Sequence, residues 1–251
     1  MRITHRLFAV LLTGISLSVA SGAIAAKAAS FDRCPRFFVN GDPPRIPNEP
    51  FWMPRALCYD AFATLHSGTT KTPLFVAERL NRTELEATRD GKRAERFFAD
   101  KRLPRVERAQ LVDYINSGFS EGRLAQPANM PTKRAVAQSF SLANSVPQAP
   151  RGGQKAWAEI EMTTREYVMR AAGDVYTISG PVFGSDAPTI GPGKVRVPKY
   201  LYKLVYDPSS GEAWAYWLEN ADEARVDRPI SYDELVARTG IQFLPGVTIK
   251  R

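Results

Sequence analysis

The sequence predicts an α+β fold in a single domain. Two kinds of segment occur along the chain in irregular order. Some are short, apolar and rich in β-branched residues, as in strands, and in others the apolar residues repeat at helical spacing. The order shows no regular βα alternation and no glycine-rich phosphate-binding motif, so the pattern is that of a mixed fold. The chain has 251 residues, which is enough for one domain with a full hydrophobic core.

The first 25 residues indicate a secretory signal peptide. Arg2 and Arg6 lie in a basic start, residues 7–20 are apolar and uncharged, and small-x-small cleavage sites end at Ala25 and Ala28. The alternative is a membrane anchor, but the apolar stretch is short and diluted by Gly, Ser and Thr. We therefore expect cleavage after residue 25, or as late as 28. The mature protein should be soluble, without a membrane span, and periplasmic or secreted.

Residues 29–57 are predicted to form an irregular Pro-rich arm ahead of a domain at 58–251. Cys34 and Cys58 are the only cysteines, and export places them in an oxidising compartment, where a disulfide is the expected state. Such a disulfide would tie the arm to the domain, and the alternative is a pair of buried thiols. Two cysteines and the one histidine that remains after cleavage cannot form a zinc site without carboxylates.

The strands are predicted from apolar runs bounded by turn residues. The predicted strands are 58–65, 73–80, 174–179, 201–206 and 212–218. The third should end at Gly180-Pro181, and Pro208-Ser209-Ser210-Gly211 between the last two is typical of a hairpin.

The helices are predicted where apolar residues fall on one face. The predicted helices are 105–115, 132–140, 154–172 and 231–240. The last begins at a capping box from Ser231 to Glu234 and stops at Gly240. The charged stretch 81–104 is predicted to be a solvated surface excursion. Residues 144–153, which hold two prolines and two glycines, are predicted to be a loop.

Three stretches together resemble one protein family. They are DYINSGFSEGRLAQPANM (113–130), SFSLANSVPQAPRGGQKAWAEIE (139–161) and VYTISGPVF (175–183). In order and spacing they are similar to the DNA/RNA non-specific endonucleases, whose patterns are D-R-G-H, then F-x-L-x-N-x-x-P-Q with N-Q-x-x-W-x-x-x-E, then V-Y-x-x-T-G-P-L-F. Arg238-Thr239-Gly240 also fits the family's tail, so the resemblance covers roughly residues 58–247.

The resemblance implies a ββα-metal (His-Me finger) nuclease fold on a central antiparallel sheet. It also implies cleavage of phosphodiester bonds with one divalent ion, usually Mg²⁺. In the family a neutral histidine takes a proton from water, and the metal and an arginine stabilise the charge that develops on the phosphate.

At the positions that carry this chemistry, the sequence departs from the family. The family histidine falls on Arg123, the arginine on Glu121, the leading aspartate on Ser120 and the metal-binding asparagine on Gly153. A guanidinium stays protonated at any working pH, a carboxylate repels phosphate, and glycine has no side chain to bind a metal. Of the metal site, only Glu161 matches, at the position of the family's outer-shell glutamate, so Mg²⁺ binding is in doubt.

The remaining candidates each have a structural alternative. Arg123 either holds a phosphate through two hydrogen bonds or forms a surface ion pair, for instance with Glu121. Asn144 matches the asparagine of the family pattern. For Arg79 and Arg82 there are two interpretations: they match a family arginine that contacts phosphate, or they belong to a solvated charged face.

His66 is the only histidine left to act as a replacement base. Its alternative role is structural, and it is far from the motif in sequence.

Three functions follow from the sequence. The first is a catalytically impaired homologue that binds nucleic acid, DNA or RNA, or a protein. The second is an active, divalent-metal-dependent endonuclease with a shifted base. The third is an envelope interaction protein that reuses the fold and has its interface on the arm. The formal net charge of +8, of which Arg2 and Arg6 are lost on cleavage, suits a polyanion such as nucleic acid.

Overall fold

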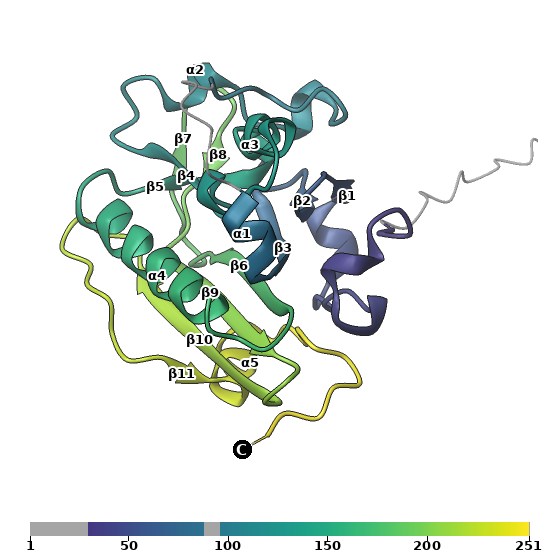
Figure 1. Ribbon diagram of the computed structural model, residues 1–251. Coiled ribbons are helices and arrows are strands. Elements are labelled where there is room, and N and C mark those ends of the chain that lie inside the picture. Colours follow the sequence, from purple (N-terminus) through teal and green to yellow (C-terminus); the bar gives the residue numbers. More distant parts are fainter. Residues whose placement is uncertain (1–29, 88–95, 251) are drawn as a thin grey trace, which may run out of the picture.

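The structure is a computed structural model that describes residues 30–87 and 96–250. Its centre is a seven-stranded antiparallel sheet in the order β1-β2-β3-β6-β9-β10-β11 (Figure 1). The strands are β1 (Pro54–Cys58), β2 (Ala63–Ser67), β3 (Pro73–Leu80), β6 (Val175–Val182), β9 (Tyr200–Asp207), β10 (Glu212–Glu219) and β11 (Ile230–Ser231). Two further pairs lie outside this sheet, β4 (Ser120–Arg123) with β5 (Ser145–Gln148), and β7 (Thr189–Ile190) with β8 (Val195–Arg196). The α+β prediction is confirmed.

Five α-helices accompany these strands in the described residues. They are α1 (Arg82–Ala87), α2 (Leu111–Tyr114), α3 (Lys133–Ser139), α4 (Gly152–Val168) and α5 (Tyr232–Thr239). The capping prediction for the last helix is confirmed, because the Ser231 hydroxyl accepts from the Glu234 amide at 3.1 Å and Gly240 ends the helix at φ 71°. None of the helices described has the length and apolar character to span a bilayer.

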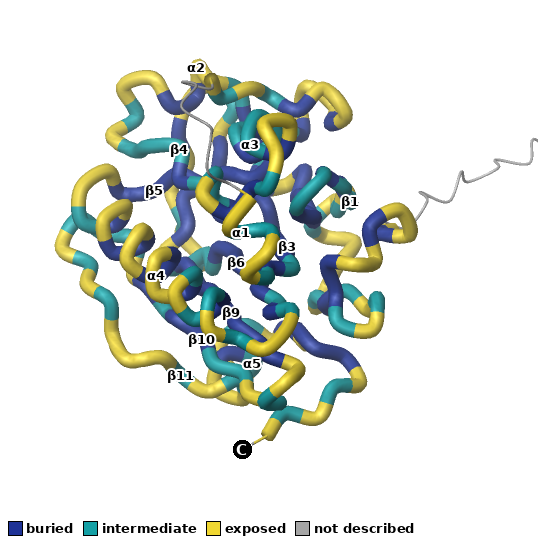
Figure 2. The backbone as a smooth tube through the Cα atoms, in the orientation of Figure 1, coloured by how far each residue is buried: buried dark blue, intermediate teal, exposed yellow. Residues whose placement is uncertain are grey.

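Both faces of the main sheet are covered, each by its own hydrophobic core. On one face, Trp157 and Ile160 of α4 pack against Val205 and Leu218 of the sheet. On the other, the N-terminal arm, α5 and the C-terminal segment bury apolar residues. Because the central strands are covered on both sides, dark buried backbone runs along β3, β6 and β9 (Figure 2). This explains why β3 begins with a continuous apolar run, residues 73–77. The predicted limits of the strand, 73–80, are confirmed.

The arm is packed rather than loose. It contains three short 3₁₀ helices, Pro35–Phe37, Val39–Gly41 and Glu49–Trp52. Phe31 and Phe38 contact Phe75 of β3 with ring centroids 5.8 and 6.2 Å apart. The disulfide between Cys34 and Cys58 is confirmed and joins the arm to β1.

Several element predictions were wrong. Residues 58–65 are not one strand, because a turn separates β1 from β2, and β1 starts inside the predicted arm. Residues 105–115 contain only a 3₁₀ turn and the short α2. Residues 144–153 contain strand β5. Strand β6 continues through Gly180-Pro181, because Gly180 leaves room for the Tyr202 hydroxyl, which donates to the Leu74 carbonyl at 3.3 Å.

The charged stretch is only partly a surface excursion. Residues 82–87 form α1, and Asp100 and Leu103 are buried. Residues 88–95 lie outside the described residues, as does the predicted signal peptide at 1–25 with its alternative end at 28.

Candidate active site

Strands β4 and β5 and helix α4 form one ββα unit, held together by the side chain of Gln148. In the antiparallel register Gly122 faces Val146, and Ser120 faces Gln148. The Gln148 side chain crosses over Gly122, where an added Cβ would lie 2.3 Å from its Oε1, and its Nε2 donates to the Gly153 carbonyl at 3.1 Å. Glycine is therefore required at position 122, because a Cβ there would clash with the buried amide that links β5 to the first turn of the helix.

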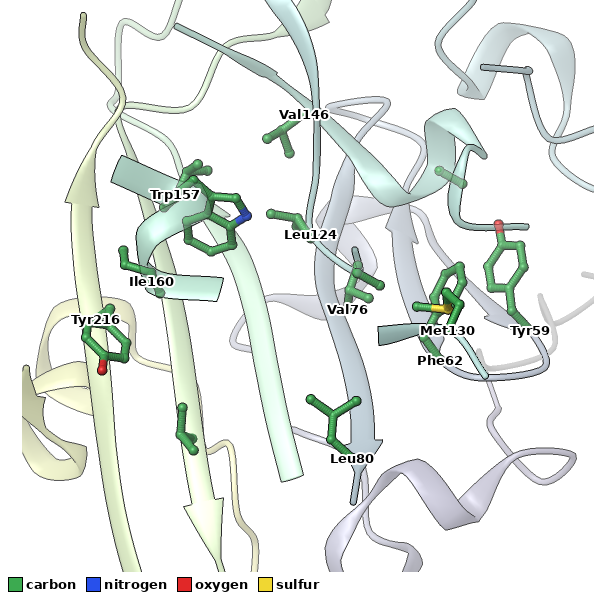
Figure 3. Packing of buried hydrophobic residues seen from close by; sticks show 14 of the residues in the cluster. Tyr59, Phe62, Val76, Leu80, Leu124, Met130, Val146, Trp157, Ile160 and Tyr216 are labelled. Carbon is green, nitrogen blue, oxygen red and sulfur yellow. The ribbon is translucent and has the colours of Figure 1, made fainter. Parts of the chain in front are cut away.

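The backbone of Arg123 is fixed from two sides. Trp157 Nε1 donates to the Arg123 carbonyl at 3.1 Å, and Gln126 Nε2 donates to the same oxygen at 2.8 Å. Figure 3 shows Trp157 on α4 beside Leu124 and Val146, with which it shares a hydrophobic cluster. The tryptophan that the family pattern keeps therefore sets the position of residue 123 relative to α4.

A pocket of about 410 Å³ opens between β4 and α4. It is lined by Glu121, Gly122, Arg123, Gln126, Pro127, Ala128, Gln148, Gln154, Trp157, Ala158, Glu161 and Arg165. The structure thus brings together three predicted site residues, Glu121, Arg123 and Glu161, although 38 positions separate Arg123 from Glu161 in the sequence. Gly153 adjoins them through its hydrogen bond to Gln148.

The Arg123 side chain lies against two aromatic rings. Its guanidinium carbon is 4.5 Å from the ring centroid of Phe140 and 5.3 Å from that of Phe97. Burial lowers the pKa of this guanidinium, and the neighbouring Glu121 carboxylate acts in the opposite direction. Arginine nevertheless remains protonated at any working pH. The side chain is therefore a cation held in place by two aromatic rings. It can bind a phosphate, but it cannot take a proton from water.

The residues present do not fit the divalent ion that the resemblance implies. Gly153, at the position of the family ligand, contributes no side chain, and an added Cβ would lie 3.0 Å from the Cβ of Ala149. Among the described residues, no three His, Cys, Asp or Glu side chains lie close enough together to hold a metal. Glu161 is the one matched metal-site residue, and its charge is already compensated within the protein.

That compensation comes from a buried lysine. Lys203 on β9 is fully buried, and its Nζ lies 3.2 Å from Glu161 Oε1 and 3.6 Å from Glu78 Oε2. Burial, chiefly, raises the pKa of Glu78, and Glu161 adds to this while Lys203 opposes it. Glu161 Oε2 faces Arg165 at 4.0 Å and has no hydrogen bond among the described residues.

Three predicted nucleic-acid contacts lie elsewhere. Asn144 is 0% exposed, and its amide exchanges hydrogen bonds with Ala125 and donates to the Ser139 carbonyl at 2.8 Å. Contact between Asn144 and nucleic acid would therefore require the 3₁₀ helix Leu142–Asn144 to rearrange. Arg79 lies 3.5 Å from Asp174 and 3.6 Å from Glu84, and Arg82 binds the Met169 carbonyl. Neither arginine lines the pocket, and their contact with phosphate stays a prediction.

His66 is placed as a structural residue. It is fully buried in β2, its Nε2 is 2.8 Å from the Glu107 carbonyl, and it does not line the pocket. Burial lowers its pKa to about 4.

Four residues of the site were missed by sequence reasoning. Phe97 and Lys203 carry no local signal, because tertiary packing brings them to the site. Phe140 is the phenylalanine of the matched F-x-L-x-N-x-x-P-Q pattern, but its contact with Arg123 is visible only in the structure. Arg165 lies one helical turn after Glu161 on α4, a spacing from which its place at the site could have been inferred. Gln148 belonged to the matched P-Q pair, yet its role in joining the three elements is visible only in the structure.

The ββα unit beside a large antiparallel sheet defines the class of protein as a ββα-metal, or His-Me finger, nuclease fold. A solved structure titled "Crystal structure of the EndoG/EndoGI complex: Mechanism of EndoG inhibition" shares this fold. Its TM-score is 0.66 at 21% sequence identity, covering 75% of this chain and 84% of that one.

The comparisons of sequence then give the family. The profile of the DNA/RNA non-specific endonucleases matches residues 48–249. Human mitochondrial endonuclease G is 31% identical over 76% of this chain and 67% of its own length. Mitochondrial nuclease EXOG of Danio rerio is 29% identical over 78% of this chain, and this match spans only 64% of that relative's length. The chain belongs to the DNA/RNA non-specific endonuclease family.

Proposed function

We propose that this protein is an exported member of the family that binds DNA or RNA without efficient cleavage. The observation that carries the proposal is the aromatic-stacked arginine at position 123, where the family has its general base. Loss of a general base alone lowers a rate on the order of 10²–10⁴-fold. Glu121 and Gly153 replace two further groups of the reaction, although such losses are not additive.

Nucleic acid is the ligand that the charges favour. The pocket keeps two guanidiniums, those of Arg123 and Arg165. The full chain carries a net charge of +8, and it stays basic when Arg2 and Arg6 are lost with the signal peptide. Because aromatic contact restricts the Arg123 guanidinium before a ligand arrives, less side-chain entropy is lost when a phosphate binds. Glu121 works against phosphate binding, so the protein should bind less tightly than a variant that lacks this carboxylate.

Export is the second part of the proposal. It rests on the basic and apolar pattern of residues 1–25 and agrees with the disulfide that joins Cys34 to Cys58. N-terminal sequencing of the protein recovered from outside the cytoplasm should give a first residue between 26 and 29. An uncleaved chain in the membrane fraction would contradict export as a free protein.

The binding test uses fluorescence anisotropy with labelled duplex DNA, single-stranded DNA and RNA at several salt concentrations, in the presence of a chelator. We expect the logarithm of the binding constant to fall linearly with the logarithm of the salt concentration, as phosphate contacts require. Negligible binding at low salt, or binding without salt dependence, would contradict the proposal.

A further inference from the structure

One edge of the main sheet, strand β1, lies at the bottom of a groove. Strand β1 is the first strand of the sheet and has a neighbour, β2, on one side only. A groove of about 410 Å³ runs along its other side and is lined by all five residues of β1. Arg33 of the arm, Arg102 and Leu103 also line this groove. β1 lies beside the arm in Figure 1.

The hydrogen-bond pattern shows which backbone groups face this groove. Tyr59 donates to the Phe62 carbonyl at 2.9 Å, and Gly68 donates to the Met53 carbonyl at 3.1 Å. Bonded and unbonded positions alternate along an antiparallel pair. Residues 55 and 57 therefore bond to β2, and residues 54, 56 and 58 point outward.

Four of the outward groups are available for pairing. Pro54 has no N–H, and the Cys58 carbonyl already accepts from Arg102 Nη1 at 2.9 Å. The Pro54 carbonyl, both backbone groups of Ala56 and the Cys58 N–H remain. None of them has a hydrogen bond across the groove within 30–87 and 96–250. A strand laid in the groove would satisfy all four.

The walls favour acidic side chains. Arg55 and Arg102 have side chains that are each 47% exposed, while their carboxylate partners, Glu107 and Asp100, are 9% and 5% exposed. The cations therefore face the groove, and the anions that balance them lie beneath it. Arg33 adds a third cation to the lining of the groove, which also includes its neighbour Asp32.

We propose that this groove binds an extended acidic segment of a partner protein, which adds to the sheet as an eighth strand. Alternate residues of that segment would face Arg55 and Arg102, so the preferred pattern is an acid at every second position. A second copy of this chain does not fit, because its own edge lies at the bottom of the same groove and two such edges cannot meet. The proposal is independent of nucleic-acid binding at Arg123.

The test uses a fluorescein-labelled peptide of four Val-Glu repeats and the intact disulfide-bonded protein. We expect saturable binding that slows amide exchange at Ala56 and Cys58, whose N–H groups face the groove, but not at Leu57, which already pairs with β2. Ala56→Pro removes one outward N–H and leaves the ladder to β2 intact, and it should weaken binding about tenfold. Arg33→Glu should weaken it as well, whereas Arg228→Glu, an equal charge change at an exposed site outside the groove, should not.

The outcomes separate the possibilities. Equal binding by wild type and Ala56→Pro, with unchanged thermal unfolding of the variant, would overturn the proposal. Binding of a Val-Lys peptide as tight as that of the Val-Glu peptide would also overturn it. So would dimerisation without peptide that Ala56→Pro abolishes, because the edge would then pair with a second copy of the chain. Two N-methylated Val-Glu peptides give a test without any protein variant. One is methylated on every valine nitrogen, and the other is methylated on every glutamate nitrogen. One of these two peptides should lose binding and the other should keep it. Loss of binding by both, or retention by both, would contradict strand addition.

Discussion

Replacement of Arg123 by glutamine removes the cation held against Phe97 and Phe140 and should weaken nucleic-acid binding by a calculable amount. Each phosphate neutralised on duplex DNA contributes about 0.9 to the slope of log affinity against log salt, and about 0.7 on single strands. If Arg123 holds one phosphate, the slope should fall by that amount. At a salt concentration of about 0.1 M, the same relation gives binding that is about eightfold weaker.

The assay is anisotropy across a salt series with a matched set of variants. Arg228→Gln makes the same charge change at an exposed site outside the pocket and should leave the slope within error of wild type. Glu121→Gln removes the anion from the pocket and should tighten binding. An unchanged slope in Arg123→Gln, with Arg228→Gln behaving identically, would refute a phosphate contact at Arg123 and leave it as a packing residue.

Three further predictions concern stability, each measured by denaturant unfolding. Lys203→Met leaves Glu161 buried without its cation and should cost about 3–5 kcal/mol. Because the buried carboxylates then lack the cation that balances their charge, this cost should be smallest below about pH 4, where carboxyl groups are protonated, and grow toward pH 7. A pH-independent cost would contradict the ion pair. His66 has a folded pKa of about 4, below its unfolded value. Wild type should therefore lose up to about 3 kcal/mol as the pH falls from about 6.5 to 4, and His66→Gln should lose less over that window. Replacing Cys34 and Cys58 together by alanine opens a link between residues 24 positions apart and should cost about 3 kcal/mol, and a cost near zero would mean that packing of the arm alone holds β1.

Elements with strong local signals were predictable from the sequence. β3 is buried on both faces, so its apolar run had clear limits, and the last helix has a side-chain cap at Ser231 and a glycine stop at Gly240. Strands β4 and β5 have only four residues each. One contains Gly122 and the other Pro147, so neither has strand propensity of its own. They form because Gln148 and α4 hold them.

The helix predicted for residues 105–115 was wrong although its local sequence favoured a helix. Its apolar spacing favours a helix, but tertiary contacts override it. The Glu107 carboxylate binds Arg55 at 2.9 Å, and Asp113 accepts from the Gly193 amide at 2.5 Å. Val106 and Ile115, expected on a core face, are 76% and 65% exposed.

The candidate site was predictable where the family motifs align and not beyond them. Those motifs placed Glu121, Arg123 and Glu161 at one site, and the structure brings these side chains to one pocket. Stacking of Arg123 on Phe97 depends on a chain segment outside the motifs. The buried ion pair between Glu161 and Lys203 joins a helix to a strand 42 positions later. Contacts of this kind are set by the folded topology rather than by local sequence.

The central claim is that the reacting positions no longer support phosphodiester cleavage, and the most direct test is cleavage itself. The mature protein is incubated with supercoiled plasmid DNA and with RNA, with Mg²⁺ or Mn²⁺ and with chelator. The variant Glu121→Arg, Arg123→His, Gly153→Asn serves as the matched reversal. We predict no chelator-sensitive nicking by the wild-type protein at concentrations that saturate binding. Nicking by wild type that the chelator abolishes would contradict this claim, because it would require a metal and a base that these residues do not provide.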